Sequence, residues 1–486
     1  MRAWWMTVVV LMSACTPEGE TPEFTTDTRI DMAPEASETE STGTVMCVSP
    51  TSKVYVAWAD DRDGASAVWL NRSLDGGNSW LASPVKVNHG EGRAEAPALT
   101  CTEQGVFVVW EDDRDGELEN HQIYFNYSLN DGNSFQDEDS LLETDVEGLT
   151  MSLGPQIVAV GSDLYVAWFD SLNGAYDIYV ASSGDNGQNW REPVRVDTDA
   201  VGEAHSAWPQ IAATEFGDVY VAWEDARNGS TDVYFSRSDN AGTSFLDNVR
   251  LDVGDAPGEG YSFNPRMGVD GDNIYVVWHD DRNGDGRDVY LNYSANGGRD
   301  WLVEDQRVDG EAEGFYNSLY ADLAVVGPVA HVAYHDDRNT GYDIYYRKVV
   351  SGVPAAEETR IESDGPGFSN SINARVAYGS GTVVVAWEDS RAEAASGAEL
   401  GFNDLYYNLS ADGGATWGEE DLRIDSMAPG ESYKIEVNLQ VVNGEVFSAW
   451  TDGRNGTADV YFQHHLLGEG GSFLDPEQAQ TAETAQ

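Results

Sequence analysis

The sequence has few basic residues, few cysteines and no long apolar run after its first residues. Lysine and arginine together number 27 against 85 aspartates and glutamates, which gives a formal net charge of −58. Such a chain repels nucleic-acid phosphates and anionic lipid headgroups, so we expect no nucleic-acid partner. The acidic excess suits an ion-rich medium, cations or basic partners. None of the three cysteines has a partner at a metal-ligand spacing.

The scarcity of apolar runs also limits how the chain meets a membrane. No segment beyond the N-terminus is long and apolar enough to span a bilayer, and no segment shows the period of an amphipathic helix. Residues 1–15 have a basic start at Arg2 and a short apolar stretch, followed by Met12-Ser13-Ala14-Cys15. This ending resembles a bacterial lipobox, so residues 1–15 are interpreted as a lipoprotein signal peptide with Cys15 as the lipidated residue. An ordinary secretory peptide is the alternative.

A repeated pair of strands dominates the rest of the sequence. Val219 to Phe245 contains two alternating runs rich in β-branched and aromatic residues, joined by a Gly/Asn/Asp turn, which predicts a β-hairpin. The same text recurs eight times, and an aromatic residue closes the second strand (B) of each repeat. These aromatics are 52 to 63 residues apart: Trp58, Trp110, Trp168, Trp223, Trp278, Tyr334, Trp387 and Trp450.

This period fits propeller blades, which need about 40 to 50 residues each. Four strand-like runs, A to D, occur in each repeat, but the last repeat lacks its D strand. Thr28-Arg29-Ile30-Asp31 near the N-terminus reads like the D strand Leu422-Arg423-Ile424-Asp425. We therefore predict an all-β, eight-bladed β-propeller of four-stranded antiparallel blades, closed by an N-terminal strand that completes the last blade. Residues 16–25 are expected to be a flexible tether, 26–473 the propeller and 474–486 a disordered tail.

The turn after strand C has a second signature, Ser-x-Asp/Asn-x-Gly-x-x-aromatic. The Asp or Asn oxygen is suited to accept N–H bonds within the turn, and glycine supplies a positive φ. Six repeats have it, but the sixth lacks it and the eighth keeps only a remnant. The central residues are Asp75, Asn130, Asp185, Asn240, Asn296 and Asp412.

This motif resembles the Asp-box, or BNR repeat, of sialidase-superfamily propellers. The resemblance covers nearly all of residues 26 to 473 and implies the fold rather than the activity, since Asp-boxes also occur in proteins that hydrolyse nothing. It also implies that the Asp-boxes lie on the face opposite the ligand site. The ligand face is then the one built by the B–C and D–A loops.

An aromatic-x-Asp-x-Arg signature follows strand B on that face. The aspartate occurs in all eight repeats, and the third repeat has Asp170 with Leu172 in place of the arginine. Since a unique function does not repeat in seven blades, we interpret the pairs as structural turn contacts, with a charged ligand-binding ring as the alternative. The pairs are Asp60/Arg62, Asp112/Arg114, Asp225/Arg227, Asp280/Arg282, Asp336/Arg338, Asp389/Arg391 and Asp452/Arg454.

The D–A loops on the same face are rich in aromatic residues beside carboxylates, a composition that suits sugar stacking and hydroxyl recognition. The alternative is that each aromatic fills the gap between adjacent blades. The candidate ligand-binding residues are His205, Trp208, Tyr261, Phe263, Phe315, Tyr316, Phe368 and Tyr433.

The resemblance to sialidases implies three arginines, a Tyr/Glu nucleophile pair and an acidic residue if the chain is catalytic. The family's Phe/Tyr-Arg-Ile-Pro motif is missing. Two arginines on inner strands, Arg266 and Arg375, are candidates for the arginine set. The Tyr/Glu combinations are Tyr261 with Glu259, Tyr316 with Glu313 and Tyr433 with Glu431.

Two smaller features leave alternatives open. Asp281, Asn283 and Asp285 begin like a calcium loop but lack its closing Glu, so Ca²⁺ is the one cofactor considered. Cys47 and Cys101 lie at similar places in the first two repeats, where a disulfide is compatible with export but is not required by the spacing.

The functional hypothesis is an exported, lipid-anchored propeller on the outer membrane or cell surface that binds a glycan or protein ligand without catalysis. We expect a monomer that meets the membrane only through its anchor. An exo-acting glycosidase of sialidase type is the first alternative, and a structural scaffold of a surface complex is the second.

Overall fold

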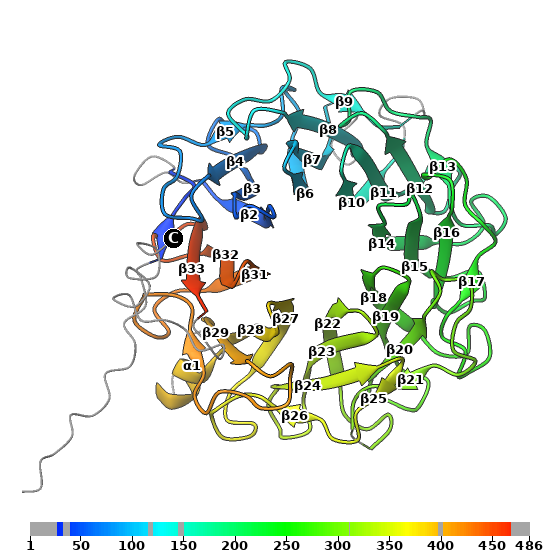
Figure 1. Cartoon of the computed structure of the whole chain (residues 1–486), viewed down its shortest axis with the longest axis vertical. Coiled ribbons are helices and arrows are strands. Elements are labelled where there is room, and N and C mark those ends of the chain that lie inside the picture. The colour runs from blue at the N-terminus through cyan, green and yellow to red at the C-terminus, as the bar shows by residue number, and fades with distance from the viewer. Residues whose placement is uncertain are drawn as a thin grey trace, which may run out of the picture.

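The computed structural model describes residues 27–32, 39–114, 120–143, 150–310, 312–396 and 402–467. Its sheets form a closed ring of eight blades (Figure 1). We use the word channel for the central axis that the inner strands surround, as in other propellers. Each blade is an antiparallel meander whose strands A to D run from the channel outward. The predicted eight-bladed β-propeller is confirmed. The predicted signal peptide with Cys15, the tether and the C-terminal tail lie outside the described residues.

The strands of blades 1 to 4 are β2 (Ser41–Val48), β3 (Val54–Asp60), β4 (Ala67–Ser73) and β5 (Val85–Lys86); β6 (Ala94–Thr102), β7 (Gly105–Asp112), β8 (Gln122–Ser128) and β9 (Ser140–Leu141); β10 (Ser152–Val160), β11 (Asp163–Asp170), β12 (Asp177–Ser183) and β13 (Val194–Arg195); β14 (Ser206–Ala213), β15 (Val219–Asp225), β16 (Asp232–Ser238) and β17 (Val249–Arg250).

The strands of blades 5 to 8 are β18 (Ser262–Asp270), β19 (Asn273–Asp280), β20 (Asp288–Ser294) and β21 (Gln306–Arg307); β22 (Ser318–Val326), β23 (Val329–Asp336), β24 (Asp343–Val350), β25 (Val353–Pro354) and β26 (Thr359–Arg360); β27 (Ser371–Gly379), β28 (Thr382–Asp389), β29 (Asp404–Ser410) and β30 (Leu422–Arg423); β31 (Lys434–Val442), β32 (Glu445–Asp452), β33 (Asp459–Leu466) and β1 (Thr28–Arg29).

Blade 8 closes the ring as predicted. Strand β1 from the N-terminus pairs antiparallel with β33, with Thr28 opposite Phe462 and Arg29 opposite Tyr461. The Arg29 side chain also forms an ion pair with Asp459 at 2.6 Å. The two ends of the chain therefore share one sheet, and no blade is left with an open edge at the closure.

Two details differ from the sequence prediction. A short helix, α1 (Arg391–Ser396), occupies the insertion after the seventh B strand, where no helical period was expected because six residues are too few to show one. Blade 6 has five strands rather than four. Since the Asp-box is missing there, β24 continues to Val350 and turns through Ser351 and Gly352 into β25.

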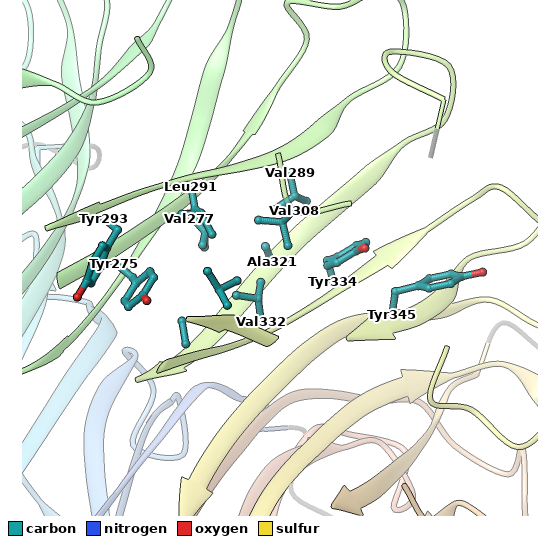
Figure 2. Packing of buried hydrophobic residues seen from close by; sticks show 12 residues of the cluster. Tyr275, Val277, Val289, Leu291, Tyr293, Val308, Ala321, Val332, Tyr334 and Tyr345 are labelled. Atoms are coloured by element: carbon teal, nitrogen blue, oxygen red, sulfur yellow. The ribbon is translucent and has the colours of Figure 1, made fainter. Parts of the chain in front are cut away.

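The hydrophobic core consists of separate layers between blades. Buried apolar side chains of the described residues form eight clusters, one at each contact between neighbouring blades. Figure 2 shows the layer in which Tyr275 and Leu291 of blade 5 face Val332 and Tyr334 of blade 6. Seven of the eight aromatics that close the B strands are fully buried tryptophans, and Tyr334 takes the eighth place. Burial of these large rings ties each blade to the one before it.

The Asp-boxes hold the C–D turns and also lock neighbouring blades. In each box the Ser hydroxyl donates to Oδ1 of the Asp or Asn, at 2.6 to 3.0 Å, and that oxygen accepts the N–H four residues on, at 2.8 to 3.1 Å. The box glycine lies directly against an aromatic ring of the preceding blade, as Gly187 does against Phe125. A side chain at that glycine would collide with the ring.

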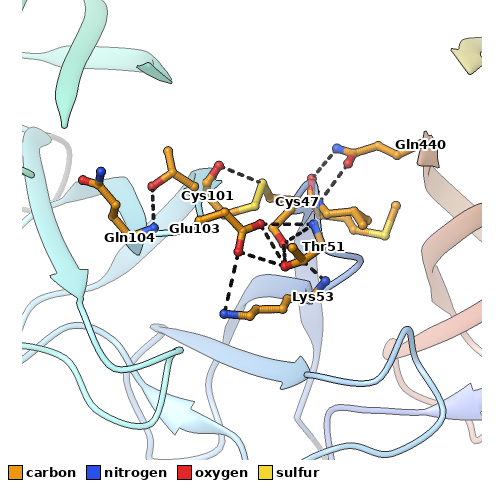
Figure 3. Close-up of a disulfide and its surroundings, with 11 residues drawn as sticks. Cys47, Thr51, Lys53, Cys101, Glu103, Gln104 and Gln440 are labelled. Carbon is orange, nitrogen blue, oxygen red and sulfur yellow. Dashed lines mark hydrogen bonds and ion pairs between the residues drawn. A yellow bond between two sulfur atoms is a disulfide. The ribbon is translucent and has the colours of Figure 1, made fainter. Parts of the chain in front are cut away.

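A disulfide joins Cys47 of β2 to Cys101 of β6, with the two Cα atoms 5.9 Å apart (Figure 3). The bond staples blade 1 to blade 2, next to the blade that closes the ring. Inner strands of neighbouring blades are therefore close enough at this depth for a bridge.

We predict that replacing both cysteines by alanine lowers the free energy of unfolding by about 4 kcal/mol, because the bridge closes a long loop in the unfolded chain. Urea unfolding measures the change. The native protein under reducing conditions is the control and should match the variant. Equal stability of the variant and the oxidised native protein would contradict the prediction.

Candidate functional site

The inner strands all carry a β-bulge near the face built by the B–C and D–A loops. In each blade the A–B register shifts by one step just after the strand begins. One residue of each bulge has a positive φ, so eight equivalent positions surround the channel mouth. They are Gly43, Ala96, Gly154, Trp208, Asn264, Tyr320, Asn373 and Glu436.

Two of these positions hold large aromatic residues in the left-handed region. Trp208 has φ 55° and is 57% exposed, and Tyr320 has φ 50° and is 50% exposed. A bulky side chain there costs about 1 kcal/mol relative to glycine, and about half of each of these two residues stays exposed to solvent. Neither placement is explained by stability of the fold, which makes both residues candidates for ligand contact.

The two rings are supported from below. Tyr320 stacks on His335, with centroids 5.3 Å apart, and Trp208 lies against Phe169 at 5.2 Å. Burial lowers the pKa of His335 to about 4, and its neutral ring accepts the N–H of Asn373 in the next blade. The platform under Tyr320 is therefore uncharged at neutral pH.

Charged side chains follow the bulges of three consecutive blades. Arg266, Asp322 and Arg375 stand two residues after Asn264, Tyr320 and Asn373. Burial and the nearby Arg375 lower the pKa of Arg266, while Asp322 opposes the shift. Among the described residues, Arg266 makes no hydrogen bond or ion pair, and Arg375 bonds only the Ala374 carbonyl. Two guanidinium groups are thus available to a ligand anion.

Hydrogen bonds from one blade to the next hold the bulges in place. In four places the residue before the B-strand aspartate accepts a backbone N–H from the inner strand of the following blade. Glu111 accepts from Gly154 at 2.8 Å and Glu224 from Asn264 at 2.6 Å. His279 and His335 accept in the same way, from Ala321 and Asn373, both at 3.2 Å. Sequence reasoning missed these contacts, because nothing local marks the donor and acceptor.

The loop aromatics chosen from the sequence divide into two groups. Tyr261, Phe315 and Phe368 are exposed, like Trp208. Phe263, Tyr316 and Tyr433 are partly buried, and Phe263 packs edge-on against His279 at 5.2 Å. His205 is exposed, lies 5.2 Å from the Tyr176 ring and accepts the Tyr176 N–H.

The loop around His205 also borders a pocket on this face. A cavity of about 550 Å³ lies between the D–A loop that follows blade 3 and the B–C turn of blade 4. Its lining is polar, with Asp199, Glu203, His205, Arg227 and Asn228. It adjoins the blade in which Leu172 replaces the turn arginine.

The Tyr/Glu combinations considered for catalysis are not joined. Within the described part of the chain, no hydrogen bond links Tyr261 to Glu259, Tyr316 to Glu313 or Tyr433 to Glu431. Glu259 is instead the acceptor of the Ala256 N–H, and Glu313 and Glu431 are exposed on their loops.

The arginines of the B–C turns are engaged within the protein. Each of the seven forms an ion pair of 2.5 to 2.7 Å with the aspartate two residues before it. Each guanidinium also lies over a C-strand aromatic ring at 3.7 to 4.7 Å. In the third blade, Asp170 accepts the N–H of Leu172 in the same geometry. These contacts hold the turns and leave the charges little capacity for a ligand.

Arg62 differs from the other six turn arginines, although the sequence motif presents all seven as equivalent. The other six also donate to the acidic or amide side chain that comes just before strand D of their own blade: Asp139, Asn248, Asp305, Glu358, Asp421 and Asp27. In blade 1 that place before β5 is held by Pro84, which offers no side-chain acceptor.

The Arg62 side chain is therefore held in another way. Its Nη2 atom pairs with Asp60 at 2.6 Å, and its Nη1 atom donates to the Asp31 carbonyl at 2.9 Å, just after the closing strand β1. Its guanidinium lies over Trp69, where the other six lie over a tyrosine, and its buried Nε atom has no hydrogen-bond partner among the described residues. Arg62 thus ties blade 1 to blade 8 at the ring closure rather than repeating the contacts of its counterparts.

Acidic groups that can hold a metal were found elsewhere than at the predicted calcium turn. Asp281 there accepts the Tyr261 N–H, and Asn283 donates to Asp288 and Tyr290. In the described residues, two triads bring their carboxylates within 4.8 Å: Asp177/Asp197/Asp199 and Asp343/Glu362/Asp364. In each triad one nitrogen of an arginine, Arg195 or Arg360, contacts all three carboxylates. The guanidinium takes the place of a metal in both.

Comparison with known proteins yields structural matches only. No protein-family model matches the sequence, and no curated protein matches it. Among solved structures, polysaccharide lyase Uly1 matches with TM-score 0.48 and 11% identity over 94% of both chains. A PL25 ulvan lyase bound to -[GlcA(1-4)Rha3S]- matches with TM-score 0.46 and 12% identity over 94% of this chain and 99% of that one. The NanB sialidase from Streptococcus pneumoniae matches with 0.38 and 9%, over 77% and 68%.

At such TM-scores these matches carry no argument about function, which therefore rests on the side chains. No helix among the described residues is long and apolar enough to cross a membrane.

We predict that Glu111→Gln stabilises the protein at alkaline pH. Burial raises the pKa of Glu111 to about 7, against about 4.3 in an unfolded chain. The folded state thus favours the protonated acid, and this contribution to stability is lost as the pH rises through 7. Glutamine stays neutral and still accepts the Gly154 N–H.

The test is urea unfolding of both proteins at pH 5 and pH 8.5. The stability advantage of the variant should be about 1 kcal/mol at pH 5 and should grow by about 2.5 kcal/mol between pH 5 and pH 8.5. His121 Nδ1 lies 3.9 Å from the Glu111 carboxylate, and the nearby charge of Glu95 adds to the rise in the pKa of Glu111. A variant that is less stable at pH 8.5 would contradict the expected sign.

Proposed function

We propose that this protein binds an acidic glycan at the channel-mouth surface, defined here by Trp208, Tyr320, Arg266 and Arg375, without hydrolysing it. The observation that carries the proposal is the exposure of two large aromatic rings in left-handed bulge positions. Other blades place glycine or a smaller residue there, so the ring itself does not require them. Residues that oppose stability and face solvent are explained by a ligand.

The aromatic pair favours a sugar. The faces of pyranose rings are apolar, and exposed Trp and Tyr rings suit stacking against them. Tyr320 is held on its His335 platform and Trp208 against Phe169. A ligand therefore meets rigid rings and loses little free energy in ordering them.

The arginine pair favours a negatively charged sugar. A guanidinium pairs with a carboxylate or sulfate through two parallel hydrogen bonds. Among the described residues neither Arg266 nor Arg375 forms an ion pair. The nearest acids that act on them are Asp322 for Arg266 and Glu388 for Arg375. Asp322, which accepts the Val376 N–H at 2.9 Å, lies between them in blade order and is placed to accept sugar hydroxyls.

Hydrolysis by an exo-acting glycosidase is the second candidate. It needs two carboxyl groups with different proton affinities. The channel mouth offers Asp322 and Glu388. Burial raises the pKa of Glu388. Glu388 is only 4% exposed, which leaves little of its carboxyl for a substrate, so we place binding first. A structural scaffold of a surface complex is the third candidate. The proposal also includes export and lipid anchoring at the cell envelope through Cys15.

We predict that Trp208→Gly and Tyr320→Gly each weaken glycan binding by at least about tenfold, or 1.4 kcal/mol. Both variants should keep or raise the melting temperature, because glycine relieves the left-handed strain. Gly43 and Gly154 already occupy the equivalent positions in blades 1 and 3. Binding is measured on an array of uronate-containing, sialylated, sulfated and neutral glycans, followed by calorimetry.

Phe216→Ala is the matched control, since this aromatic is 85% exposed on an A–B loop at the opposite face; it should bind like the native protein. Arg266→Gln should remove the preference for acidic over neutral glycans. Retained binding by both glycine variants, or a drop in their melting temperature, would overturn the proposal. Release of fluorophore from a fluorogenic sialoside would favour the glycosidase instead.

A further inference from the structure

One lysine of the protein is completely buried. Lys434, at the start of β31, has a side chain that is 0% exposed. The chain has only four lysines: Lys53, Lys86, Lys348 and Lys434. A buried ammonium group is costly unless it is paired or changed chemically.

The amine of Lys434 lies among three oxygen atoms. Its Nζ is 3.0 Å from Oδ1 of Asp404 and 3.7 Å from Oδ1 of Asp425, and both carboxylates are also fully buried. The Ser432 carbonyl is the third neighbour, at 3.1 Å. Asp404 starts β29 of blade 7, so the contact crosses from blade 8 to blade 7.

The blade architecture does not need this lysine. Six other blades begin the inner strand with serine at the same position, and blade 2 has alanine. The serines are Ser41, Ser152, Ser206, Ser262, Ser318 and Ser371. Asp404 has equivalents in blades 3 to 6, Asp177, Asp232, Asp288 and Asp343, which are held by arginines from strand D. Within the described residues, only blade 8 supplies an amine to such an aspartate.

We propose that Lys434 and Asp404 form an intramolecular amide bond, an isopeptide cross-link between blades 8 and 7. The buried amine already touches the carboxyl group that it would attack. The inference is independent of the proposed glycan binding.

The surrounding groups supply what the condensation requires. Nζ of Lys434 bonds to Cγ of Asp404, one C–O bond of that carboxyl breaks, and one water molecule leaves. The ammonium loses two protons and the departing oxygen takes both, so no oxidant, reductant or cofactor is needed. The Gly430 N–H lies 3.2 and 3.0 Å from the two Asp404 oxygens, where it stabilises negative charge on the tetrahedral intermediate.

Asp425 is positioned to move the protons. Burial raises its pKa to about 6, and the neighbouring Lys434 opposes the shift. Its Oδ2 is buried and has no hydrogen-bond partner among the described residues. This carboxyl group is thus suited to take a proton from the amine and return it to the leaving oxygen.

The bond would reinforce the ring beside its closure. Blade 8 is closed by β1, which comes from the N-terminal part of the chain and pairs with β33. The disulfide of Cys47 and Cys101 ties blade 1 to blade 2, and the cross-link would tie blade 7 to blade 8. Covalent bonds would then flank the closure on both sides.

Tryptic peptide mapping of the full-length protein tests the proposal. Trypsin cuts after Arg391, Arg423, Lys434 and Arg454, but not after an acylated lysine. We expect residues 392–423 and 424–454 as one branched species, lighter than the two peptides together by one water molecule. Cleavage after Lys434 in all of the protein would overturn the proposal. A single peptide 424–454 that has lost water would show an amide to Asp425 and overturn the assignment to Asp404.

Two variants serve as controls. Lys434→Ser copies the other blades, so it should fold, melt at a lower temperature and give no branched species. Asp425→Asn keeps the shape but cannot relay protons, and we expect its cross-linked fraction to fall severalfold. An unchanged fraction in Asp425→Asn would overturn the role of Asp425. A branched species in Lys434→Ser would overturn the role of Lys434.

Discussion

The structure depends on one buried aspartate at the end of each B strand. Its carboxylate accepts the N–H two residues on in all eight blades and the arginine of that turn in seven. In six blades it also accepts the hydroxyl of the serine that starts the inner strand, at 2.5 to 3.1 Å. In five the buried B-strand tryptophan donates its indole N–H. A buried charge with so many donors is stable, and it joins strands A and B and the B–C turn at one point.

Part of the acidic excess of the chain lies in buried groups of carboxylates. Most blades place a second group of carboxylates at the start of strand C and the end of strand D, held by the D-strand arginine. These groups contain more carboxylates than positive charges. Burial therefore raises the pKa of Asp252 to about 8 and the pKa of Glu362 to about 9. In blade 7 the positive charge beside Asp404 and Asp425 comes instead from Lys434 of blade 8. The repeated arginines are used in this internal charge balance, whereas Arg266 and Arg375 on the inner strands form no ion pair among the described residues.

Strict repetition identifies structural residues, and departures from it identify candidates for function. The Asp-box, the turn aspartate and the buried tryptophan recur because every blade must meet the same two neighbours. Trp208, Tyr320 and Lys434 each stand where other blades have a smaller residue. Each is explained poorly by the packing of its own blade, and each is therefore better explained by a ligand or a chemical bond.

The sequence by itself determined the blade count, the strand order and the closure by the N-terminal strand, because these follow from local periodicity and repeated text. The sequence did not predict helix α1 or the fifth strand of blade 6, since both lie where the repeat is broken. The aromatic loops were recognised as candidates, but their sequence does not separate exposed Phe315 from half-buried Phe263. In the same way the turn motif does not separate Arg62, whose second partner is the Asp31 carbonyl at the ring closure, from the six arginines that donate to a side chain just before strand D of their own blade.

Only the tertiary structure decided which residues of different blades come together. The bulge exposes Trp208 and Tyr320 to solvent through backbone angles that no residue pattern specifies. The closed ring brings Arg266 and Arg375 to one channel from blades that are not adjacent. The pairing of Cys47 with Cys101 and of Lys434 with Asp404 likewise depends on the distance between neighbouring blades, which the chain acquires only when all eight pack into a closed ring.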